Sequence, residues 1–245
     1  MALTYVFRRI EKKYRITAAE AEALKGALCD VLCPDAFGVS TVGNLYLDTP
    51  DFLLIRRSIE AEAYKEKLRL RCYGKPTDDS TVFLELKKKY NGVVGKRRIA
   101  LPLGEACAYL ESGVPPREGQ IMRELDYAMT LYRHPSPRVA LFYEREAYAY
   151  EGEAGVRLTF DTGVRYRTDD LLLQHGSEGR RILPDGTVLM EIKCVGAMPL
   201  RLAHLLDAMR IFPARFSKYG TAYTDLLREG ALPVFPSIPS KETVS

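Results

Sequence analysis

The chain has 245 residues, 47% of them apolar, so it can bury a sizeable core in one large β-rich domain or in two small ones. Lys and Arg exceed Asp and Glu by 36 − 32 = 4, a net charge too small for histone-like, nonspecific binding of nucleic acid. Five cysteines without CxxC spacing argue against a disulfide framework, and no apolar run approaches the roughly 20 residues of a membrane span, so we expect a cytoplasmic protein.

Before residue 80 the sequence predicts a strand, a helix and two further strands. Thr17 and Glu20 form a capping-box pattern, which is typical of a helix start. Leucines at four-residue intervals extend this helix to about Leu32. The predicted strands cover residues 5–16, 41–48 and 65–73.

The clearest predicted element is a hairpin around Asn91-Gly92, a dipeptide typical of a two-residue type I′ turn. Its strands cover residues 81–90 and 93–101, and Gly95 offers a bulge that would shift the register by one residue. Ideal pairing without that bulge places these residues opposite one another on one face: Glu85 and Arg98, and Lys87 and Lys96. Opposed lysines repel each other, so this pairing requires an anion to stabilise it.

The second half of the chain predicts helices and strands in alternation. Helices are expected over residues 118–132 and 199–211 and in a short segment through Leu227, and strands over residues 138–150, 156–165 and 188–195. Together these elements indicate one α+β domain over residues 1–230, built around an antiparallel sheet or barrel. Residues 231–245 are expected to form a flexible tail.

Charged residues recur at every second position of several predicted strands. Successive side chains of a strand point to opposite faces, so the charges gather on one face and the apolar residues on the other. If the sheet closes into a barrel, the charged face lines a lumen that suits a polyanion and a metal ion. The pattern comprises Glu11 and Lys13; Lys67, Arg69 and Arg71; Glu85 and Lys87; Arg157 and Asp161; and Glu191 and Lys193.

Two other interpretations of these charges remain open. A single charged residue on a strand is usually a solvent-facing side chain, although repetition across several strands weakens this interpretation. A basic sheet with interleaved aromatic residues also suits nucleic acid. The aromatic residues that keep this second possibility open are Tyr14, Tyr73, Tyr90, Tyr143 and Tyr148.

Familiar catalytic motifs are missing from the sequence, including the GxxxxGK[ST] loop, GxGxxG after a strand and the GxSxG elbow. The three histidines lack metal-ligand spacing. Carboxylates interleaved with Lys and Arg suit Mg²⁺ or Mn²⁺ that bridges phosphate oxygens. Phosphoryl transfer needs little more than charge neutralisation, alignment and a positioned nucleophile.

These segments resemble the VTC domain, the polyphosphate polymerase branch of the triphosphate tunnel metalloenzymes, over roughly residues 5–228. Each motif is short, and the resemblance rests on their shared order along the chain. The motifs are Arg9-x-Glu11-x-Lys13-Tyr14, Lys67-x-Arg69-x-Arg71, Glu85-Leu86-Lys87, Tyr143-x-Arg145, Arg157-x-Thr159-x-Asp161, Glu191-Ile192-Lys193 and Phe216-Ser217-Lys218-Tyr219.

The resemblance implies a closed, eight-stranded antiparallel barrel with flanking helices that transfers the γ-phosphoryl group of ATP to a growing polyphosphate chain. It implies Mn²⁺ or Mg²⁺ as cofactor, and ATP, polyphosphate or triphosphate, and pyrophosphate or phosphate as partners, without nucleic acid. The catalytic, phosphate-holding residues would be Lys13, Arg69, Arg71, Lys87, Arg145, Arg157, Lys193 and Lys218. Further substrate contacts would come from Tyr143, Arg215, Ser217, Lys67, Lys96 and Arg98.

For the metal, the resemblance implies Glu191 as the principal ligand. Glu11, Glu85 and Asp161 would be either water-mediated metal contacts or orienting partners of the cations. The hydrolytic relatives typically begin with ExExK, whereas this chain has Arg9 in place of the first glutamate, which favours the polymerase branch. A tripolyphosphate or nucleoside-triphosphate hydrolase and a non-catalytic polyphosphate-binding module remain the alternatives.

Overall fold

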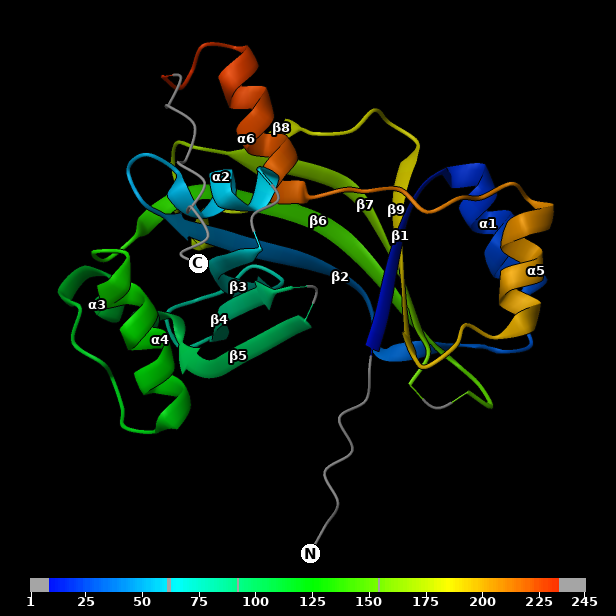
Figure 1. The fold of residues 1–245 in the computed structure, drawn as a ribbon, viewed down its shortest axis with the longest axis horizontal. Coiled ribbons are helices and arrows are strands. Elements are labelled where there is room, and N and C mark those ends of the chain that lie inside the picture. Colours follow the sequence, from blue (N-terminus) through cyan, green and yellow to red (C-terminus); the bar gives the residue numbers. More distant parts are fainter. Residues whose placement is uncertain (1–8, 61–62, 92, 154, 234–245) are drawn as a thin grey trace, which may run out of the picture. The chain divides into compact units, whose positions relative to one another are not determined.

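The computed structural model describes residues 9–60, 63–91, 93–153 and 155–233 (Figure 1). The strands are β1 (Arg9–Thr17), β2 (Leu32–Asp48), β3 (Tyr64–Tyr73), β4 (Thr81–Tyr90), β5 (Val93–Pro102), β6 (Ser136–Tyr150), β7 (Arg157–Arg167), β8 (Arg180–Arg181) and β9 (Thr187–Val195). The helices are α1 (Ala18–Ala27), α2 (Leu53–Ile59), α3 (Leu103–Ser112), α4 (Gln120–Leu131), α5 (Leu200–Ala208) and α6 (Lys218–Arg228). None of these described helices is long and apolar enough to cross a bilayer.

Hydrogen bonds connect the strands in the order β1-β9-β7-β6-β2-β3-β4-β5, and β8 pairs with β7. The pairs β1–β9, β7–β9, β3–β4 and β4–β5 are all antiparallel. An α+β fold with an antiparallel sheet and flanking helices is therefore confirmed. The strand order has two ends, β1 and β5, so the pairing of the described strands does not confirm closure into a barrel.

The chain divides into two compact units, each with its own apolar core. The first unit comprises Met1–Val42, Tyr143–Arg165 and Leu183–Phe216. The second comprises Gly43–Phe142, Tyr166–Ile182 and Ser217–Ser245. The single domain over residues 1–230 stays a prediction, and most of the predicted tail lies outside the described residues.

In the first unit, α1 begins at the predicted capping box. The Thr17 hydroxyl accepts a hydrogen bond from the Glu20 amide at 3.1 Å, and the Glu20 carboxylate accepts one from the Thr17 amide at 2.7 Å. The helix ends at Ala27, so its predicted extension to Leu32 is wrong. The backbone leaves the helix in a tight turn, and the guanidinium of Arg201 on α5 satisfies a group left open at the helix end by donating to the Ala27 carbonyl. Leu32 is buried in the same core, but from β2.

In the second unit, α3 and α4 cover the apolar face of the β3–β4–β5 meander (Figure 1). Alternate strand residues such as Leu68, Leu84 and Leu86 are fully buried in a core that also contains helix residues such as Tyr109 and Leu125. The sequence did not predict α2 or α3. Neither helix has a side-chain hydrogen bond from its own N-cap residue, which is the local signal for a helix start.

The predicted hairpin register is confirmed residue by residue. Tyr90 lies opposite Val93, Lys87 opposite Lys96, and Glu85 opposite Arg98. Lys88 pairs with Gly95 in the same unbroken register, so the bulge considered at Gly95 is absent from the described hairpin. One face of β3, β4 and β5 therefore carries the predicted charges in cross-strand rows.

Candidate functional site

The charged residues of the second unit form what we call the Glu85 cluster. Its members lie on one face of β3, β4 and β5, and the leucines between them point into the core. One row across the three strands consists of lysines only. The next row has Glu85 in the middle and one arginine on each side of it. In order, the members are Lys67, Lys87 and Lys96; Arg69, Glu85 and Arg98; and Arg71. Six cations and one carboxylate give these side chains a net charge of 6 − 1 = +5.

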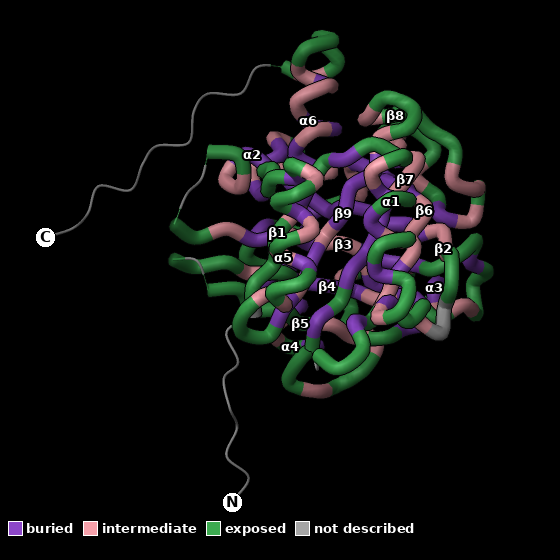
Figure 2. Tube along the Cα trace, turned by 90° about the vertical axis from the view of Figure 1, so that its right-hand side faces the viewer, coloured by how far each residue is buried: buried purple, intermediate pink, exposed green. Residues whose placement is uncertain are grey.

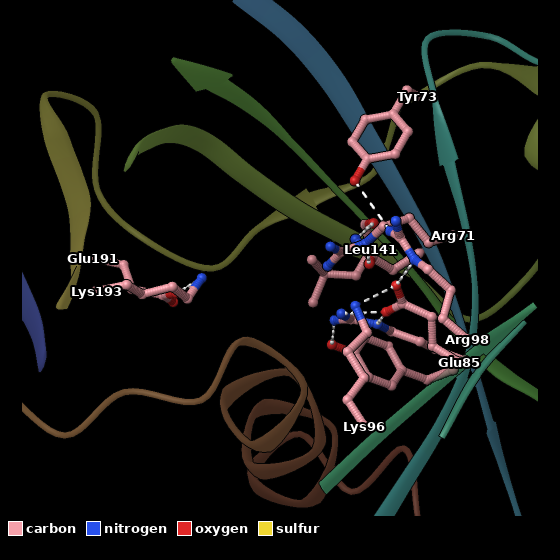
Figure 3. Close-up of polar contacts among 11 residues, drawn as sticks. Arg71, Tyr73, Glu85, Lys96, Arg98, Leu141, Glu191 and Lys193 are labelled. Carbon is pink, nitrogen blue, oxygen red and sulfur yellow. Dashed lines mark hydrogen bonds and ion pairs between the residues drawn. The ribbon is translucent and has the colours of Figure 1, made fainter. Parts of the chain in front are cut away.

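Glu85 is the ionised centre of this cluster, and only 1% of its surface is exposed. One carboxylate oxygen contacts Arg69 at 2.6 Å, and the other contacts Arg98 at 2.6 Å and Lys96 at 2.7 Å (Figure 3). Burial alone would raise the pKa of Glu85, but Arg69, Arg71 and Lys96 hold it well below its ordinary value. With both oxygens engaged, Glu85 suits the orienting role better than that of a metal ligand.

Neighbouring polar groups fix the directions of two arginines in the Glu85 cluster. The side-chain oxygen of Asn44 accepts from Arg71 at 2.9 Å, and its amide donates to the Leu141 carbonyl at 3.3 Å. The Tyr73 hydroxyl accepts from Arg98 at 3.3 Å (Figure 3). These contacts hold the guanidinium groups in place before any ligand binds, which lowers the entropic cost of binding.

Tyr46 on β2 adds a titratable hydroxyl to the same face. Its oxygen accepts from Arg69 at 3.4 Å, and its ring stacks on Tyr219 with a centroid distance of 4.3 Å. Burial would raise the pKa of Tyr46, but the charges of Arg69, Lys67 and Arg71 outweigh it and lower the pKa to about 8. The Tyr46 hydroxyl can therefore lose its proton close to physiological pH.

The start of α6 also meets the Glu85 cluster. Ser217 caps the helix by accepting from the Gly220 amide at 3.1 Å, and the same hydroxyl accepts from Lys67 at 3.0 Å. Lys218 is the first residue of the helix. The partial positive charge of a helix N-terminus favours anions, so it adds to the charge of the lysines.

Six predicted residues of the first unit form what we call the Glu191 cluster. On the β1–β9 pair, Lys13 lies opposite Glu191 and Glu11 opposite Lys193, which makes a checkerboard of alternating charge. Lys193 pairs with the Glu191 carboxylate (Figure 3), and Lys13 lies 3.2 Å from Glu11 and 3.9 Å from Glu191. The other members are Arg145 and Asp161.

Glu191 is ionised over the whole physiological pH range. Burial would raise its pKa, but Lys193, Lys13 and Arg145 lower the pKa to about 2. A carboxylate in this state can accept hydrogen bonds or coordinate a hard cation without first losing a proton.

Arg145 on β6 is held in a fixed orientation by two neighbours. Its Nε and Nη2 atoms donate to the two oxygens of Asp161 at 2.6 and 2.8 Å, a bidentate pair of the strong, directional kind. Its guanidinium also lies over the ring of Tyr143, 5.1 Å from the centroid. Asp161 is buried and uses both oxygens, so it too fits the orienting role that was one of its two predicted alternatives.

The two remaining predicted residues of the first unit lie beside the Glu191 cluster. Arg157 is opposite Lys193 in the β7–β9 register, but it is exposed and paired with Asp35. Arg215 is exposed and follows Ala214, whose amide donates to the Lys13 carbonyl at 2.7 Å. Both residues lie close enough to extend the cluster, and neither is part of its buried network.

Two carboxylates of the first unit offer donor groups that fit a divalent ion. Within the described residues, no group of three or more His, Cys, Asp or Glu side chains is placed to hold a metal. Glu191 and Glu11 flank Lys13, and two carboxylates suit an ion such as Mg²⁺ that takes its other ligands from water and phosphate oxygens. Glu191 is the best candidate ligand, because its second carboxylate oxygen is only loosely engaged by Lys13 at 3.9 Å, and Glu11 lies beside it.

Nucleic-acid binding by stacked bases fits the described residues less well. Stacking requires exposed rings, but Tyr14 and Tyr143 are buried and Tyr148 packs edge-on against Phe160. Tyr73 and Tyr90 remain exposed. The sheet thus lacks the continuous row of open aromatic rings that this interpretation requires.

Sequence reasoning missed Tyr46 and Asn44 as site residues. Both belong to the predicted strand 41–48, in which Asn44, Tyr46 and Asp48 alternate with the buried, apolar Leu45 and Leu47. The same two-residue period that identified the charged positions places these residues on the polar face. This period identifies Asn44 and Tyr46 as residues of the polar face although neither side chain is charged.

Comparison with known proteins agrees with the predicted resemblance. The family model described as the VTC domain matches residues 8–227. An alignment 166 positions long, which covers 58% of this chain and 23% of the other protein, shows 25% identity to vacuolar transporter chaperone complex subunit 4 of Schizosaccharomyces pombe. The chain thus spans about a quarter of the length of that relative.

Two solved structures match this chain over most of its length. A candidate adenylyl cyclase from Hippeastrum, described as having a dominant triphosphatase activity, gives a TM-score of 0.50 at 17% identity over 92% of this chain and 98% of its own. A candidate adenylate cyclase from Bacillus halodurans gives 0.46 at 17% identity over 96% and 95%. The Hippeastrum likeness shows a shared fold. Because the family match covers nearly all of the sequence, this chain belongs to the VTC domain family.

Proposed function

We propose that this chain is a metal-dependent polyphosphate polymerase that transfers the γ-phosphoryl group of ATP to a growing polyphosphate chain. The sequence resemblance implies this activity, and the match to a subunit of the vacuolar transporter chaperone complex supports it. The resemblance also implies that the sheet closes into a tunnel, and we include this closure in the proposal.

The observation that carries the proposal is the array of opposed cations in the Glu85 cluster. Lys67, Lys87 and Lys96 occupy one cross-strand row, and in the next row Arg69 and Arg98 flank Glu85, whose single carboxylate does not offset the charge of the six cations. Directly opposed like charges destabilise a sheet unless an anion lies between them. An array that extends both along and across the strands suits several linked phosphates better than one isolated anion.

Polymerase activity uses this charge more fully than hydrolysis does. Elongation brings an anionic acceptor to an anionic donor, and clustered cations lower the repulsion between them. In hydrolysis the acceptor is neutral water. Arg9, at the position where hydrolytic relatives typically have the first glutamate, also favours elongation.

The Glu191 cluster is proposed to bind and align the reacting phosphates. Lys13, Arg145 and Lys193 would contact phosphate oxygens, and Tyr143 and Asp161 would keep Arg145 in position. Glu191, with Glu11, would hold Mg²⁺ or Mn²⁺, which supplies positive charge against the phosphate oxygens when it is bound. Further phosphate contacts are proposed for Arg157, Arg215, Ser217 and Lys218.

The test is turnover of γ-labelled ATP with Mn²⁺, followed by separation of the products by length. We expect label in chains that lengthen with time, and orthophosphate as the only labelled product would contradict the proposal in favour of a hydrolase. Arg69→Ala should reduce the yield of chains. Lys75→Ala removes the same charge from the exposed turn after β3 and is the matched control.

A further inference from the structure

The hairpin of β4 and β5 ends in an apolar tip, which consists of Tyr90, Val93 and Val94. These side chains are 59%, 74% and 51% exposed, so apolar surface remains in contact with water. Figure 2 shows the described ends of both strands beside their turn as exposed. A Cβ atom at the neighbouring Gly95 would meet no atom of the described residues within 4 Å, so this side of the tip is open.

Basic residues flank the hairpin tip in both strands. The stretch from residue 87 to residue 98 contains six cations and no acidic residue. Because successive side chains of a strand point to opposite faces, these cations lie on both faces of the hairpin. They are Lys87, Lys88 and Lys89 in β4 and Lys96, Arg97 and Arg98 in β5.

Positive charge remains in excess around the tip after its ion pairs are counted. Three carboxylates outside the stretch pair with four of the six cations. The pairs are Glu66 with Lys88, Glu124 with Arg97, and Glu85 with Lys96 and Arg98. The stretch and these three partners together carry 6 − 3 = +3. A surplus of this kind attracts a negatively charged surface over about 10 Å at moderate ionic strength.

A tyrosine pair holds the tip in place. Tyr64 lies opposite Tyr90 in the β3–β4 register, and their ring centroids are 6.4 Å apart. The Tyr64 hydroxyl donates to Glu66 at 2.6 Å. The apolar side chains are therefore presented by a braced strand end, which lowers the entropic cost of docking.

An apolar tip between cations suits the surface of an anionic lipid bilayer. A tyrosine ring with its hydroxyl is most stable at the level of the headgroups, and valine side chains are stable at the boundary of the acyl chains. Lysine and arginine beside such a segment contact anionic headgroups. A bilayer surface also meets both faces of a protruding hairpin at once, which matches the distribution of the cations.

Two other occupants fit the hairpin tip less well. A soluble polyanion would contact the cations but would leave Val93 and Val94 in water. A stable protein interface takes about 20 to 30 residues from each partner, whereas the tip is a single turn with three apolar side chains.

We propose that the tip of the β4–β5 hairpin docks on the surface of an anionic lipid bilayer, with Val93 and Val94 below the headgroups and the flanking lysines and arginines among them. This inference goes beyond the proposed polymerase activity and does not depend on it. It predicts that the protein binds negatively charged vesicles, that salt weakens this binding, and that neutral vesicles bind much less.

Fluorescence can report directly on the tip, because the chain contains no tryptophan. Val93→Trp places a single indole at the tip. Its emission should shift to shorter wavelength with vesicles of phosphatidylcholine and phosphatidylglycerol, and should stay unchanged with phosphatidylcholine alone. Val114→Trp is the matched control, because Val114 is 66% exposed in the loop between α3 and α4, and its emission should not shift with either vesicle.

Cosedimentation with the mixed vesicles measures the apolar contribution. Val93→Ser/Val94→Ser should bind about tenfold more weakly than the wild type, because fewer apolar groups leave water on docking. Val114→Ser/Leu172→Ser removes two exposed apolar side chains elsewhere in the same unit and should bind like the wild type. Denaturant unfolding checks that each variant is folded.

The same assay measures the contribution of charge. Lys89→Gln should bind the mixed vesicles about fivefold more weakly, as expected for one cation near an anionic surface. Lys75→Gln removes an exposed charge from the turn after β3 and should leave the binding unchanged.

Several results would overturn the docking surface. These are a wild-type protein that does not bind the mixed vesicles, equal binding by wild type and Val93→Ser/Val94→Ser, and an emission shift of Val114→Trp as large as that of Val93→Trp. A shift of Val93→Trp that appears without vesicles as the protein concentration rises would instead place a second copy at the tip, and it would also overturn the proposal. Vesicle binding needs no ATP, so its failure is distinguishable from a failure of the polymerase activity.

Discussion

The carboxylate of Glu85 contacts three cations, so the Glu85→Gln variant keeps the shape of the side chain and removes the charge that neutralises them. We expect the free energy of unfolding to fall by about 3 kcal/mol, because a buried ion pair that loses one partner leaves uncompensated charge. Tripolyphosphate should stabilise the variant more than the wild type. Denaturant unfolding with and without tripolyphosphate measures both effects.

Glu105→Gln is the control for this variant, because Glu105 forms an exposed ion pair with Arg117 and its loss should change stability by less than about 1 kcal/mol.

The stability that Glu85 provides should depend on pH. The pKa of Glu85 is lowered, so its stabilisation is complete above the ordinary glutamate pKa of about 4.3 and is lost as the pH falls below that value. Equal stability of Glu85→Gln and wild type at pH 7 would contradict the role given to this carboxylate.

Tyr46 should make anion binding depend on pH. Its pKa of about 8 means that it becomes negative as the pH rises from 7 to 9, beside Arg69, Lys67 and Arg71. The affinity of the wild type for long-chain polyphosphate should therefore fall over this range, and Tyr46→Phe should show a smaller fall. Tyr73 and Lys96 also have lowered pKa values, but both remain in the variant, so the difference between the two curves reports on Tyr46. Superimposable curves would refute this assignment.

At the scale of single residues, the alternation of charged and apolar side chains identified most members of both clusters, and the resemblance to the VTC domain added others, among them Arg145 and Ser217. All eighteen predicted site residues lie in or beside the Glu85 cluster or the Glu191 cluster. The hydrogen-bond and ion-pair partners of each side chain could not be predicted from the sequence. Whether Asp161 faces a metal or Arg145 depends on how side chains pack between the neighbouring strands β6 and β7, which the alternation of charges does not determine.

Among the elements, α6 is tied to the sheet by Tyr219. Its hydroxyl donates to the buried Asp48 at 2.8 Å, and its ring stacks on Tyr46. Tyr219→Phe should lower the free energy of unfolding by about 1 to 3 kcal/mol, because Asp48 loses a donor in a buried place. Thermal or denaturant unfolding measures the loss.

Tyr223→Phe is the matched control, because Tyr223 is a buried tyrosine of the same helix that packs against Phe52. A loss of stability for Tyr223→Phe as large as that for Tyr219→Phe would contradict a specific role of the bond to Asp48. The position of Ser217 beside Lys67 depends on the same docking. Tyr219→Phe should therefore also weaken the binding of tripolyphosphate.

Strands were easier to predict than helices in this chain. The strands β3, β4, β5 and β9 begin and end within one residue of their predicted limits, because alternation and turn residues are local signals. The N-terminus of α2 is instead capped by the Asp48 carboxylate, which accepts from the Leu54 amide at 2.9 Å across six residues. The start of α3 follows Pro102 directly, without a capping side chain. Helix starts of this kind carry no short-range signal.

For the molecule as a whole, we expect anion binding and turnover to depend on different residues. Glu191→Gln should abolish metal-dependent elongation from ATP while metal-free binding of tripolyphosphate is retained, because the Glu85 cluster is untouched. Arg69→Ala should weaken the binding itself. Elongation from ATP and metal-free binding of tripolyphosphate are measured in parallel. Full elongation by Glu191→Gln would contradict the proposal that this carboxylate is a metal ligand.

The family and the antiparallel sheet were predictable from the sequence because both depend on the order of local motifs. Whether the sheet closes into a barrel is not predictable in this way, because the ends of the strand order, β1 and β5, are set by pairing between distant segments. The charge pattern alone indicated a polyanion and a metal ion, and the resemblance to the VTC domain narrowed the polyanion to linked phosphates. Whether water or a phosphate chain accepts the phosphoryl group depends on how the acceptor is aligned with the donor. No single sequence motif determines this alignment.

A crystal structure of the protein with tripolyphosphate and Mn²⁺ would show directly whether the Glu85 cluster binds linked phosphates. We expect phosphate oxygens within hydrogen-bond distance of Arg69 and Lys87 on the β3–β4–β5 face. Tripolyphosphate bound elsewhere, with these side chains still turned toward solvent or toward Glu85 alone, would contradict it.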